Sequence, residues 1–439
     1  MVQRRSGRSV SARRVSARVS RRDLLRGFSA ASLLVAAAPG RAAARIFSQS
    51  RPGPRVAVVG AGVFGAFSAL SLRRAGARVT LLDGWGPGNS RASSGGETRV
   101  IRGVYGPDRI YLEMVARAFE LWRDNERRWK RTLYHPTGAI WLVTGPDDFI
   151  RAAMPLLRER GFPYEELTTA EARRRWPQID FEGVRWVFRE ERAGYLLARQ
   201  SCAAAVEGFR SEGGEYRETA VEPGPIRNGA LTGLRLADGS TLTADAYLFA
   251  CGPWLPKVFP DLLKGAIQPT RQEVFFFGTP SGDGRFSEGT MPVWVDFGPR
   301  LFYGIPGNEG RGFKVADDSR GEPFDPTGGD RIASVEGLRA ARQFLERRFP
   351  GMKGAPLTES RVCQYENTTD HHFLLDRHPG AGNAWIAGGG SGHGFKMGPA
   401  VGERVADLVL GRAKVDPFFG LSRLAKPSAR AGSPSEIGS

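Results

Sequence analysis

The stretch RVAVVGAGVFG, residues 55–65, decides the fold that this sequence predicts. A short apolar strand runs directly into a GxGxxG loop, a helical stretch follows over residues 66–75, and a second apolar strand over residues 79–82 ends at Asp83. Strand, glycine loop, helix, strand and acid in this order are typical of the first unit of a doubly wound nucleotide-binding sheet. The sequence therefore predicts an α/β fold with a dinucleotide site at its first strand-to-helix turn.

Each glycine of this loop has its own expected task. Gly60 permits a tight turn, Gly62 lets the backbone approach a pyrophosphate, and Gly65 lets the helix pack closely against the strand. The helix N-terminus should then offer free N–H groups and the positive end of its dipole to the phosphates. Asp83, about 20 residues further on, is placed to accept hydrogen bonds from the ribose hydroxyls.

A second strand-to-glycine-loop transition, WIAGGGSGHGFK, occupies residues 385–396. One dinucleotide seldom needs two glycine loops unless it is long and extended, and FAD is such a ligand, with ADP at one end and isoalloxazine at the other. We expect Gly389, Gly392 and His393 near the flavin, although a histidine held only by backbone groups is an equal alternative for His393. Gly252, which follows a buried strand, is also expected to contact the cofactor.

The chain of 439 residues is long enough for two or more domains. We predict an FAD-binding domain that is discontinuous in sequence, from residues 54–104, 190–262 and 360–412. Residues 105–189 and 263–359 should form a substrate domain on a mostly antiparallel sheet. Elsewhere the pattern predicts helices over residues 111–129 and 401–410, strands over 274–277 and 300–303, and a hairpin whose turn is Asp238-Gly239.

Composition excludes several other classes of protein. Three cysteines cannot staple a chain of this length, and five scattered histidines do not suggest a structural zinc module, so no metal site is expected. The net charge of +17 is concentrated in residues 1–44, which hold ten arginines and one acid. The body is only mildly basic, and no nucleic-acid-binding motif accompanies it.

Residues 1–44 resemble a twin-arginine export signal. Arg21 and Arg22 precede a short apolar stretch of small residues, and Ala44 ends a small-residue cleavage site. We expect a periplasmic or extracellular mature protein without a stable membrane span, because the apolar run is shorter than the roughly 20 residues that a bilayer requires. An arginine-rich tail with a chance apolar patch is the alternative. The polar tail over residues 426–439 should be disordered.

Separated motifs along the rest of the chain identify a known family. They are GAGVFG at 60–65, ETRVIR at 97–102, YG at 105–106, QP at 268–269 with RQ at 271–272, YG at 303–304 with GFK at 312–314, VCQY at 362–365 and SGHGFK at 391–396. In these motifs the chain resembles the flavin-dependent amine oxidases of the monomeric sarcosine oxidase and N-methyltryptophan oxidase type, within the D-amino-acid-oxidase-like superfamily. The resemblance covers most of residues 54–412.

The resemblance implies roles for residues around the flavin. Cys363 matches the cysteine that carries FAD through a thioether to its 8α-methyl group, whereas a buried strand cysteine is the plain alternative. Lys314 matches the lysine over the flavin that helps molecular oxygen react, since a fixed positive charge favours the first electron transfer. Arg99 is expected near the flavin as well.

The resemblance also implies a substrate site. Arg102 and Lys396 match the pair that binds the substrate carboxylate, which needs charge pairing in a partly dry pocket. Tyr303 and Tyr365 would line the cavity. Two histidines of the sarcosine-oxidising members are replaced by Ser94 and Gly95, and a third falls on Asp318, which puts sarcosine itself in doubt as the substrate.

The function expected from this resemblance is FAD-dependent oxidation of a secondary or N-methyl amino acid to an imine, with oxygen as acceptor and hydrogen peroxide as product. The partners are then a small-molecule amine, oxygen and the twin-arginine export machinery, and the protein is expected to be a monomer. One alternative is an exported dehydrogenase that passes electrons to a quinone or a protein. Another is a flavin-binding protein without turnover.

Overall fold

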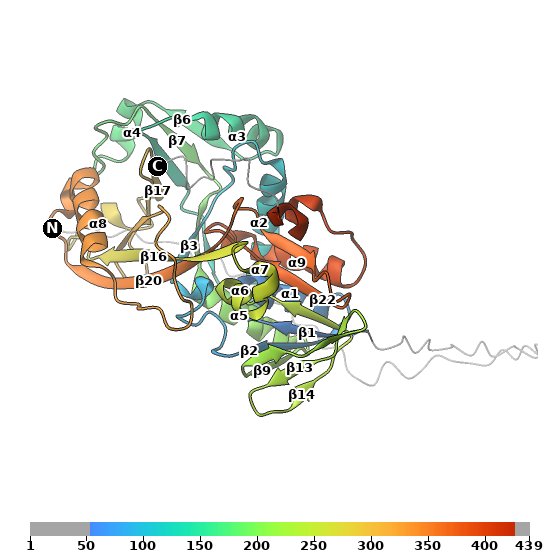
Figure 1. Cartoon of the computed structure of the whole chain (residues 1–439). Helices are drawn as coiled ribbons and strands as arrows, with labels where there is room; N and C mark the ends of the chain where they lie inside the picture. Colours follow the sequence, from blue (N-terminus) through green and yellow to red (C-terminus); the bar gives the residue numbers. More distant parts are fainter. Residues whose placement is uncertain (1–52, 426–439) are drawn as a thin grey trace, which may run out of the picture. The chain divides into compact units, whose positions relative to one another are not determined.

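The predicted first unit forms the centre of a six-stranded sheet in the computed structural model, which describes residues 53–425 (Figure 1). The strand order is β21-β22-β15-β1-β2-β9, all parallel except the antiparallel edge strand β21. The predicted doubly wound sheet is therefore confirmed. Its strands are β1 (Arg55–Val59), β2 (Arg78–Asp83), β9 (Glu215–Glu218), β15 (Ala246–Phe249), β21 (Leu374–Arg377) and β22 (Ala384–Gly388).

Strand β1 is buried on both of its faces, which explains its unbroken apolar sequence. Val56 and Val58 pack into the larger hydrophobic core beneath helices α1, α2, α5 and α9. Ala57 and Val59 point the other way, into a second core that includes residues of β13 and of the short helices α6 and α7. Both sides of the sheet are therefore covered, and the carboxyl ends of its strands remain as the place for a ligand.

The helices mostly match the periodicity of the sequence. The first one begins at Val63, three residues before the predicted start, because Gly62 already serves as its N-cap. The helices are α1 (Val63–Arg74), α2 (Arg109–Trp129), α3 (Asp148–Glu159), α4 (Thr169–Arg175), α5 (Ala198–Ser211), α6 (Leu255–Val258), α7 (Pro260–Leu263), α8 (Val335–Arg348) and α9 (Gly398–Val409).

A larger, eight-stranded sheet carries the order β20-β16-β19-β18-β17-β5-β7-β6. Its neighbours pair antiparallel except for β17 and β5, so the mostly antiparallel second sheet is confirmed. Its strands are β5 (Ala139–Val143), β6 (Tyr164–Leu167), β7 (Trp186–Glu190), β16 (Ile267–Phe277), β17 (Val293–Phe297), β18 (Phe302–Ile305), β19 (Phe313–Asp317) and β20 (Leu357–Thr368).

Three small sheets complete the described part of the chain. The predicted hairpin is present between β13 and β14, and Gly239 in its turn has a φ of +83°. The strands of these sheets are β3 (Thr98–Ile101), β4 (Tyr134–His135) and β8 (Gly194–Leu197); β10 (Val221–Pro223), β13 (Leu234–Leu236) and β14 (Thr241–Leu242); and β11 (Ile226–Arg227) and β12 (Ala230–Leu231).

The described residues belong to one compact unit, and the division into two domains stays a prediction. The boundary expected at residue 360 lies inside β20, which pairs along its whole length with β16 of the larger sheet. The export signal expected over residues 1–44 and the tail expected over residues 426–439 lie outside the described residues.

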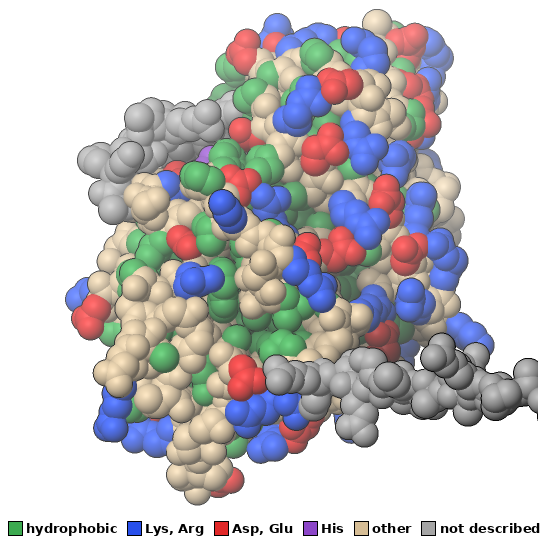
Figure 2. All heavy atoms as spheres, turned by 90° about the vertical axis from the view of Figure 1, so that its right-hand side faces the viewer, with side chains coloured by type: hydrophobic (Ala, Val, Ile, Leu, Met, Phe, Trp, Pro, Cys, Tyr) green, Lys and Arg blue, Asp and Glu red, His purple; other side chains and the backbone are tan. Residues whose placement is uncertain are grey.

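The surface of residues 53–425 mixes charges of both signs. Figure 2 shows Lys and Arg side chains interspersed with Asp and Glu, and many of them form ion pairs such as Arg74–Glu212 at 2.7 Å. Within the same residues, no helix combines the length and apolar character that a membrane crossing needs. The described His, Cys, Asp and Glu side chains also form no cluster of three or more that could hold a metal ion.

Candidate active site

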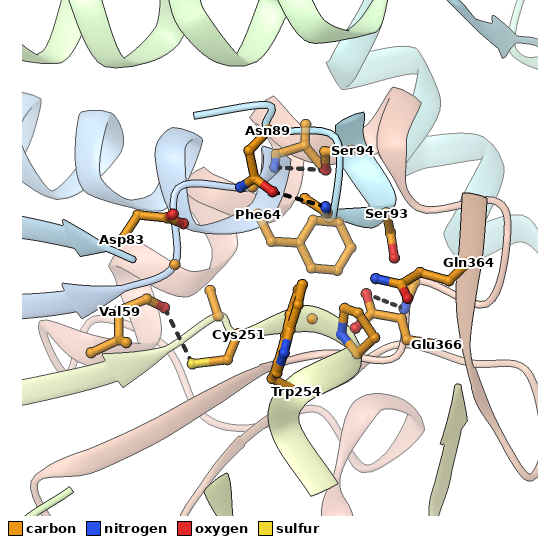
Figure 3. A pocket seen from close by; sticks show the side chains of 18 of the residues that line it. Val59, Phe64, Asp83, Asn89, Ser93, Ser94, Cys251, Trp254, Gln364 and Glu366 are labelled. Atoms are coloured by element: carbon orange, nitrogen blue, oxygen red, sulfur yellow. Dashed lines mark hydrogen bonds between the residues drawn. The ribbon is translucent and has the colours of Figure 1, made fainter. Parts of the chain in front are cut away.

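A cavity of about 250 Å³ lies at the carboxyl ends of β1, β2 and β15, and we call it the cofactor cavity (Figure 3). Both glycine loops line it, Gly60 and Gly62 from the first and Gly390, Gly392 and Gly394 from the second. Two segments more than 300 residues apart in sequence therefore meet around one space. This is the arrangement that an extended dinucleotide requires.

The first glycine loop brings the backbone close to this space. Gly60 has a φ of +103°, and a Cβ there would lie 2.4 Å from the carbonyl oxygen of Ala250. A Cβ on Gly65 would lie 1.8 Å from the carbonyl oxygen of Gly60, so only glycine allows helix α1 to lie against this turn. A Cβ on Gly62 would have only Ser94 Oγ within 4 Å, at 3.4 Å, so Gly62 keeps the space in front of the helix open.

Helix α1 points its N-terminus at the cavity. Its N-cap, Gly62, has no side chain to satisfy the first N–H groups, and Val63 N donates to Ser94 Oγ at 3.1 Å. The uncapped N–H groups and the positive end of the helix dipole suit a phosphate. Ser94, noted in the sequence only as a replaced histidine, thus supports the first turn of this helix.

Asp83 lines the cavity at the end of β2, but its carboxylate also organises the loop. It accepts hydrogen bonds from Ala61 N at 2.7 Å and Trp85 N at 2.8 Å. Burial raises the pKa of Asp83, and these backbone hydrogen bonds oppose that effect. Asp83 therefore fixes the first glycine loop, and its contact with a ribose stays a prediction.

The second glycine loop and strand β20 close the opposite wall. Glu366 accepts a hydrogen bond from Gly390 N at 3.2 Å through Oε1, while its buried Oε2 has no hydrogen-bond partner within the described chain. Burial raises the pKa of Glu366 to about 7. Figure 3 shows Phe64, Trp254 and Glu366 turned toward the same space. An uncapped helix terminus, a glycine cradle and an orphaned buried oxygen together fit the phosphates and hydroxyls of FAD.

Of two further glycines predicted to bind the cofactor, one lines the cofactor cavity and the other does not. Gly252 lines the cofactor cavity, with a φ of +53°. Gly389 is not among the lining residues, and a Cβ there would lie 2.5 Å from Thr368 Cγ2. Its φ of +68° makes it a turn residue that leads the loop toward the cavity.

A second cavity of about 90 Å³ shares a wall with the first, and we call it the substrate cavity. Arg99, Tyr365, Gly392 and Phe395 line both cavities. The residues that line only the second include most of the predicted substrate-binding set. They are Arg102, Tyr303, His393 and Lys396, together with Asp318, Ser391, Trp141, Val100, Val295 and Leu301.

Arg102 is held in this cavity by aromatic rings and backbone. Its guanidinium lies 4.7 Å from the ring centre of Tyr105 and 5.2 Å from that of Trp141, and it donates to the carbonyl oxygen of Val104. Buried Glu190 holds the neighbouring backbone, since it accepts from Gly103 N at 2.6 Å and from Trp141 Nε1 at 2.9 Å. The planar cation is therefore oriented before any substrate binds.

Lys396 is a second, more deeply buried cation beside Arg102. Its Nζ donates to the carbonyl oxygen of His393 at 2.7 Å and to Tyr105 Oη at 3.0 Å. Burial, and then the nearby Arg102, lower the pKa of Lys396 well below its ordinary value. A carboxylate bound beside these two groups would counter that repulsion, so the arrangement suits an anionic group of a substrate.

His393 lies on the substrate cavity and is held by polar neighbours. Its Nε2 is 3.0 Å from the carbonyl oxygen of His371, and its Nδ1 is 3.4 Å from Tyr105 Oη. Burial and Lys396 lower the pKa of His393 well below its ordinary value. A neutral imidazole in this position is consistent with the structural role weighed for it from the sequence.

Among the described residues, Asp318 is the one acidic residue that lines the substrate cavity. It is half-buried, Tyr365 Oη donates to its Oδ1 at 2.7 Å, and burial raises its pKa to about 6. The sequence flagged Asp318 only as a departure from the resembled family. Its place in the cavity depends on the pairing of β18 with β19, which sequence spacing does not reveal.

Lys314 and Cys363 lie on a third, small cavity of about 10 Å³ that Arg99 also lines. Lys314 Nζ donates to the carbonyl oxygen of Thr98 at 3.2 Å, and burial, followed by Arg99, lowers the pKa of Lys314 to about 7. Cys363 Sγ accepts from Arg99 Nη2 at 3.1 Å. Arg99 thus lines all three cavities and donates a hydrogen bond to the predicted tethering residue.

These adjoining cavities define the class of protein: an enzyme that brings a dinucleotide cofactor against a small, charged substrate. Comparison with known families agrees, since the family described as FAD dependent oxidoreductase matches residues 55–408. Similar proteins include a monomeric sarcosine oxidase of Bacillus sp. (strain B-0618), 33% identical over 84% of this chain and 96% of that protein. The N-methyl-L-tryptophan oxidase of Salmonella heidelberg is 26% identical over 83% of this chain and 96% of that protein.

Solved structures share the fold. The L-proline dehydrogenase from P. horikoshii superposes with a TM-score of 0.75 at 21% identity, over 85% of this chain and 98% of that one. Amadoriase I from Aspergillus fumigatus, a fructosyl amine:oxygen oxidoreductase, gives a TM-score of 0.72 at 21% identity, over 88% and 94%. The chain belongs to the family of FAD-dependent oxidoreductases, and within it to the monomeric sarcosine oxidase group.

Proposed function

We propose that this enzyme oxidises the CH–NH bond of a secondary or N-methyl amino acid to an imine, with molecular oxygen as the electron acceptor. Water then hydrolyses the imine to a carbonyl compound and an amine, and oxygen leaves as hydrogen peroxide. The observation that carries this proposal is the shared wall of the two cavities, which sets Arg102 and Lys396 beside the cofactor cavity.

FAD supplies the two-electron acceptor for this reaction when it is bound in the cofactor cavity. Arg102 and Lys396 bind and orient the substrate carboxylate, so that the C–H bond faces the shared wall. Tyr303 and Tyr365 enclose the bound amine and limit water. Lys314 holds a positive charge where oxygen becomes reduced, which stabilises the negative charge that develops there.

The test is an assay of the purified holoenzyme in air with a panel of N-methyl amino acids and the corresponding primary amino acids. Peroxide formation with stoichiometric oxygen consumption is the expected result for at least one secondary amine. Turnover only with an artificial dye in the absence of peroxide would show instead a dehydrogenase with a quinone or protein acceptor. No turnover with any amine under either condition would contradict the proposal.

We also propose that Cys363 carries the FAD through a thioether. This bond would join Sγ to the 8α-methyl carbon, each losing one hydrogen, and the two hydrogens with their electrons would pass to oxygen as hydrogen peroxide. In support, Cys363 Sγ lies on the small cavity with Arg99, one of the residues that line the cofactor cavity. Yellow colour should remain with acid-precipitated wild-type chain and leave Cys363→Ala.

A matched control for this experiment is Cys251→Ala. Cys251 lines the cofactor cavity but lies beside Val59, with its Sγ 3.7 Å from that residue's carbonyl oxygen. This variant should keep its colour after precipitation. If colour is lost on precipitation of the wild-type chain as well, the cofactor is held without a covalent bond.

We propose further that residues 1–44 export the protein by the twin-arginine route, already loaded with its cofactor. The paired Arg21 and Arg22 ahead of an apolar stretch support this. Replacing both by lysine should leave the uncleaved chain in the cytoplasm, whereas the unchanged chain should be found shortened outside it. Equal distribution of the two chains would contradict export.

A further inference from the structure

We propose that Asp318 selects substrates that carry a second cationic group, an ammonium or guanidinium, in addition to the reacting amine and the carboxylate. This inference rests on the proposed function and names the class of amino acid that the same cavity would take. Its basis is a carboxylate in the substrate cavity that has kept one oxygen available.

The position of Asp318 follows from the strand register. Lys314, Ala316 and Asp318 alternate onto one face of the chain at β19, and Ala316 pairs with Tyr303 of β18. The backbone of Asp318 is fixed, because its N–H donates to the carbonyl oxygen of Leu301 at 2.9 Å. Asp318 therefore lies at a set place in the cavity wall, on the side that Tyr303 also lines.

The bonding of Asp318 is incomplete. Tyr365 Oη donates to Oδ1, but within residues 53–425 no lysine or arginine forms an ion pair with this carboxylate. Arg102 and Lys396 act on it only from a distance. A carboxylate in a partly dry cavity is costly unless a cation or several donors satisfy it, so the missing partner is one that the substrate can supply.

A comparison with Glu190, the other acid near Arg102, shows why Asp318 is unusual. Glu190 does not line the cavity, and its two oxygens accept from Gly103 N and from Trp141 Nε1. It serves the framework behind Arg102. Asp318 lines the cavity with only one of its oxygens in a hydrogen bond, as expected of a group that binds part of a ligand.

The reacting amine is a poor candidate for this partner. Oxidation at the C–H bond requires the amine in its neutral form, and a carboxylate in contact with it would stabilise the ammonium form instead. A second cation on the substrate, directed away from the reacting amine, satisfies Asp318 without this penalty. The cavity then offers cations for the carboxylate end and an anion for the other end.

The experiment compares N-methyl derivatives of L-2,4-diaminobutyrate, L-norvaline and L-homoserine, whose side chains have equal length and end in an ammonium, a methyl and a hydroxyl group. A second series repeats the comparison with one more methylene in the side chain. It consists of the N-methyl derivatives of L-ornithine, L-norleucine and L-5-hydroxynorvaline. Each is assayed with the holoenzyme for kcat/KM. The wild-type enzyme should prefer the ammonium member over the methyl member of one series by about 10- to 100-fold.

Two variants assign this preference to the residue. Asp318→Asn keeps an oxygen for Tyr365 but removes the charge, so the ratio of kcat/KM for the ammonium member to that for the methyl member should fall to about 1. Asp317→Asn is the matched control, because Asp317 pairs with Arg300 at 2.6 Å and does not line the cavity. It should leave the preference intact.

The possible failures are distinct. Equal kcat/KM for the ammonium and methyl members in the wild-type enzyme would overturn the inference, as would a uniform loss with all members in Asp318→Asn. A hydroxyl member preferred over the ammonium member would show that Asp318 reads hydroxyl donors and not charge, and would overturn it too. Oxidation of sarcosine but of no member of either series would show that the substrate carries no second cationic group. It would overturn this inference but leave the proposed function standing. If sarcosine and all other secondary amines fail, the proposed function itself is wrong.

Discussion

The cofactor cavity and the substrate cavity share a wall but differ in how much glycine backbone they contain. Two glycine loops form part of the first at the ends of parallel strands, where a Cβ on Gly60 would lie only 2.4 Å from the carbonyl oxygen of Ala250. The second is formed by long side chains, among them Arg102, Asp318 and Lys396, which come from segments far apart in the sequence.

This difference determines which positions of the two cavities can accept a different residue. The close contacts of the glycine loops tolerate no added side chain, so this part of the cofactor cavity cannot be changed by a single replacement without moving the backbone. A cavity made of side chains can acquire a new preference through one replacement on an unchanged backbone. Asp318 stands where the resembled family has a histidine, and it directly follows β19, which pairs with β18 from Lys314 to Asp317.

The strongest way to test this contrast is to add one methyl group where helix α1 packs against the first glycine loop. In Gly65→Ala the new Cβ would lie 1.8 Å from Gly60 O, so helix α1 must move away from β1. We expect a loss of about 3 kcal/mol or more in the free energy of unfolding, measured by denaturant titration, together with loss of blue absorbance.

Gly62→Ala is the matched partner of that variant. Gly62 has a φ of −66°, and its new methyl group would contact only Ser94 Oγ. It should fold with nearly unchanged stability yet retain less flavin per chain, because the methyl group enters the space reserved for the pyrophosphate. Equal stability loss in both variants would contradict the distinction between a packing glycine and a ligand-facing glycine.

The next largest effect should come from Lys314, which lines the small third cavity together with Arg99. Lys314→Met should slow the reaction of the reduced enzyme with oxygen by about 100- to 1,000-fold, while anaerobic reduction by substrate changes little. Stopped-flow spectroscopy separates the two half-reactions. The charge of Lys314 is present below its pKa of about 7 and lost above it, so the wild-type rate with oxygen should fall as the pH rises from 6 to 8.5.

The control for this prediction is the pH dependence of the variant itself. Lys314→Met has no titrating group at this place, so its slow reaction with oxygen should be flat over the same range. A fall with pH that persists in the variant would assign the titration to another group.

Arg102 tests the substrate cavity alone. Arg102→Met should lower kcat/KM for an amino acid by about 100-fold or more, because it leaves a carboxylate without its planar partner. The same variant should lose far less with an N-methyl amine that lacks a carboxylate. Flavin content should stay at the wild-type level, since Arg102 does not line the cofactor cavity. A parallel loss with both substrates would indicate damage to the site as a whole.

The sequence could predict the part of the molecule that local pattern determines. The strand, glycine loop and helix at residues 55–75, the final buried strand β22 and the Asp238-Gly239 hairpin turn all depend on neighbouring residues, and all are present. The sequence also placed both glycine loops on one cofactor, and the structure brings them to one cavity.

What the sequence could not predict depends on contacts between distant segments. Glu366 follows Cys363 and Tyr365 in a strand, and only the fold shows that its Oε2 is buried beside Gly252 with no hydrogen-bond partner among residues 53–425. The available signal was an acid directly after the matched motif VCQY at residues 362–365. Asp318 was seen as a departure, but its bond to Tyr365 required the arrangement of β18, β19 and β20.

The smallest expected effect concerns this orphaned acid in the cofactor cavity, Glu366. Its carboxyl has a pKa of about 7 when folded and an ordinary value of 4.5, so wild-type stability should decrease as the pH rises from about 4.5 through 7. Glu366→Gln carries no charge to bury. It should melt a few degrees above the wild-type holoenzyme at pH 8 and near it or below it at pH 5, as followed by circular dichroism. If the difference in melting temperature is the same at both pH values, the bound cofactor satisfies the buried oxygen of ionised Glu366. Cofactor binding would then depend on a side chain as well as on the glycine loops.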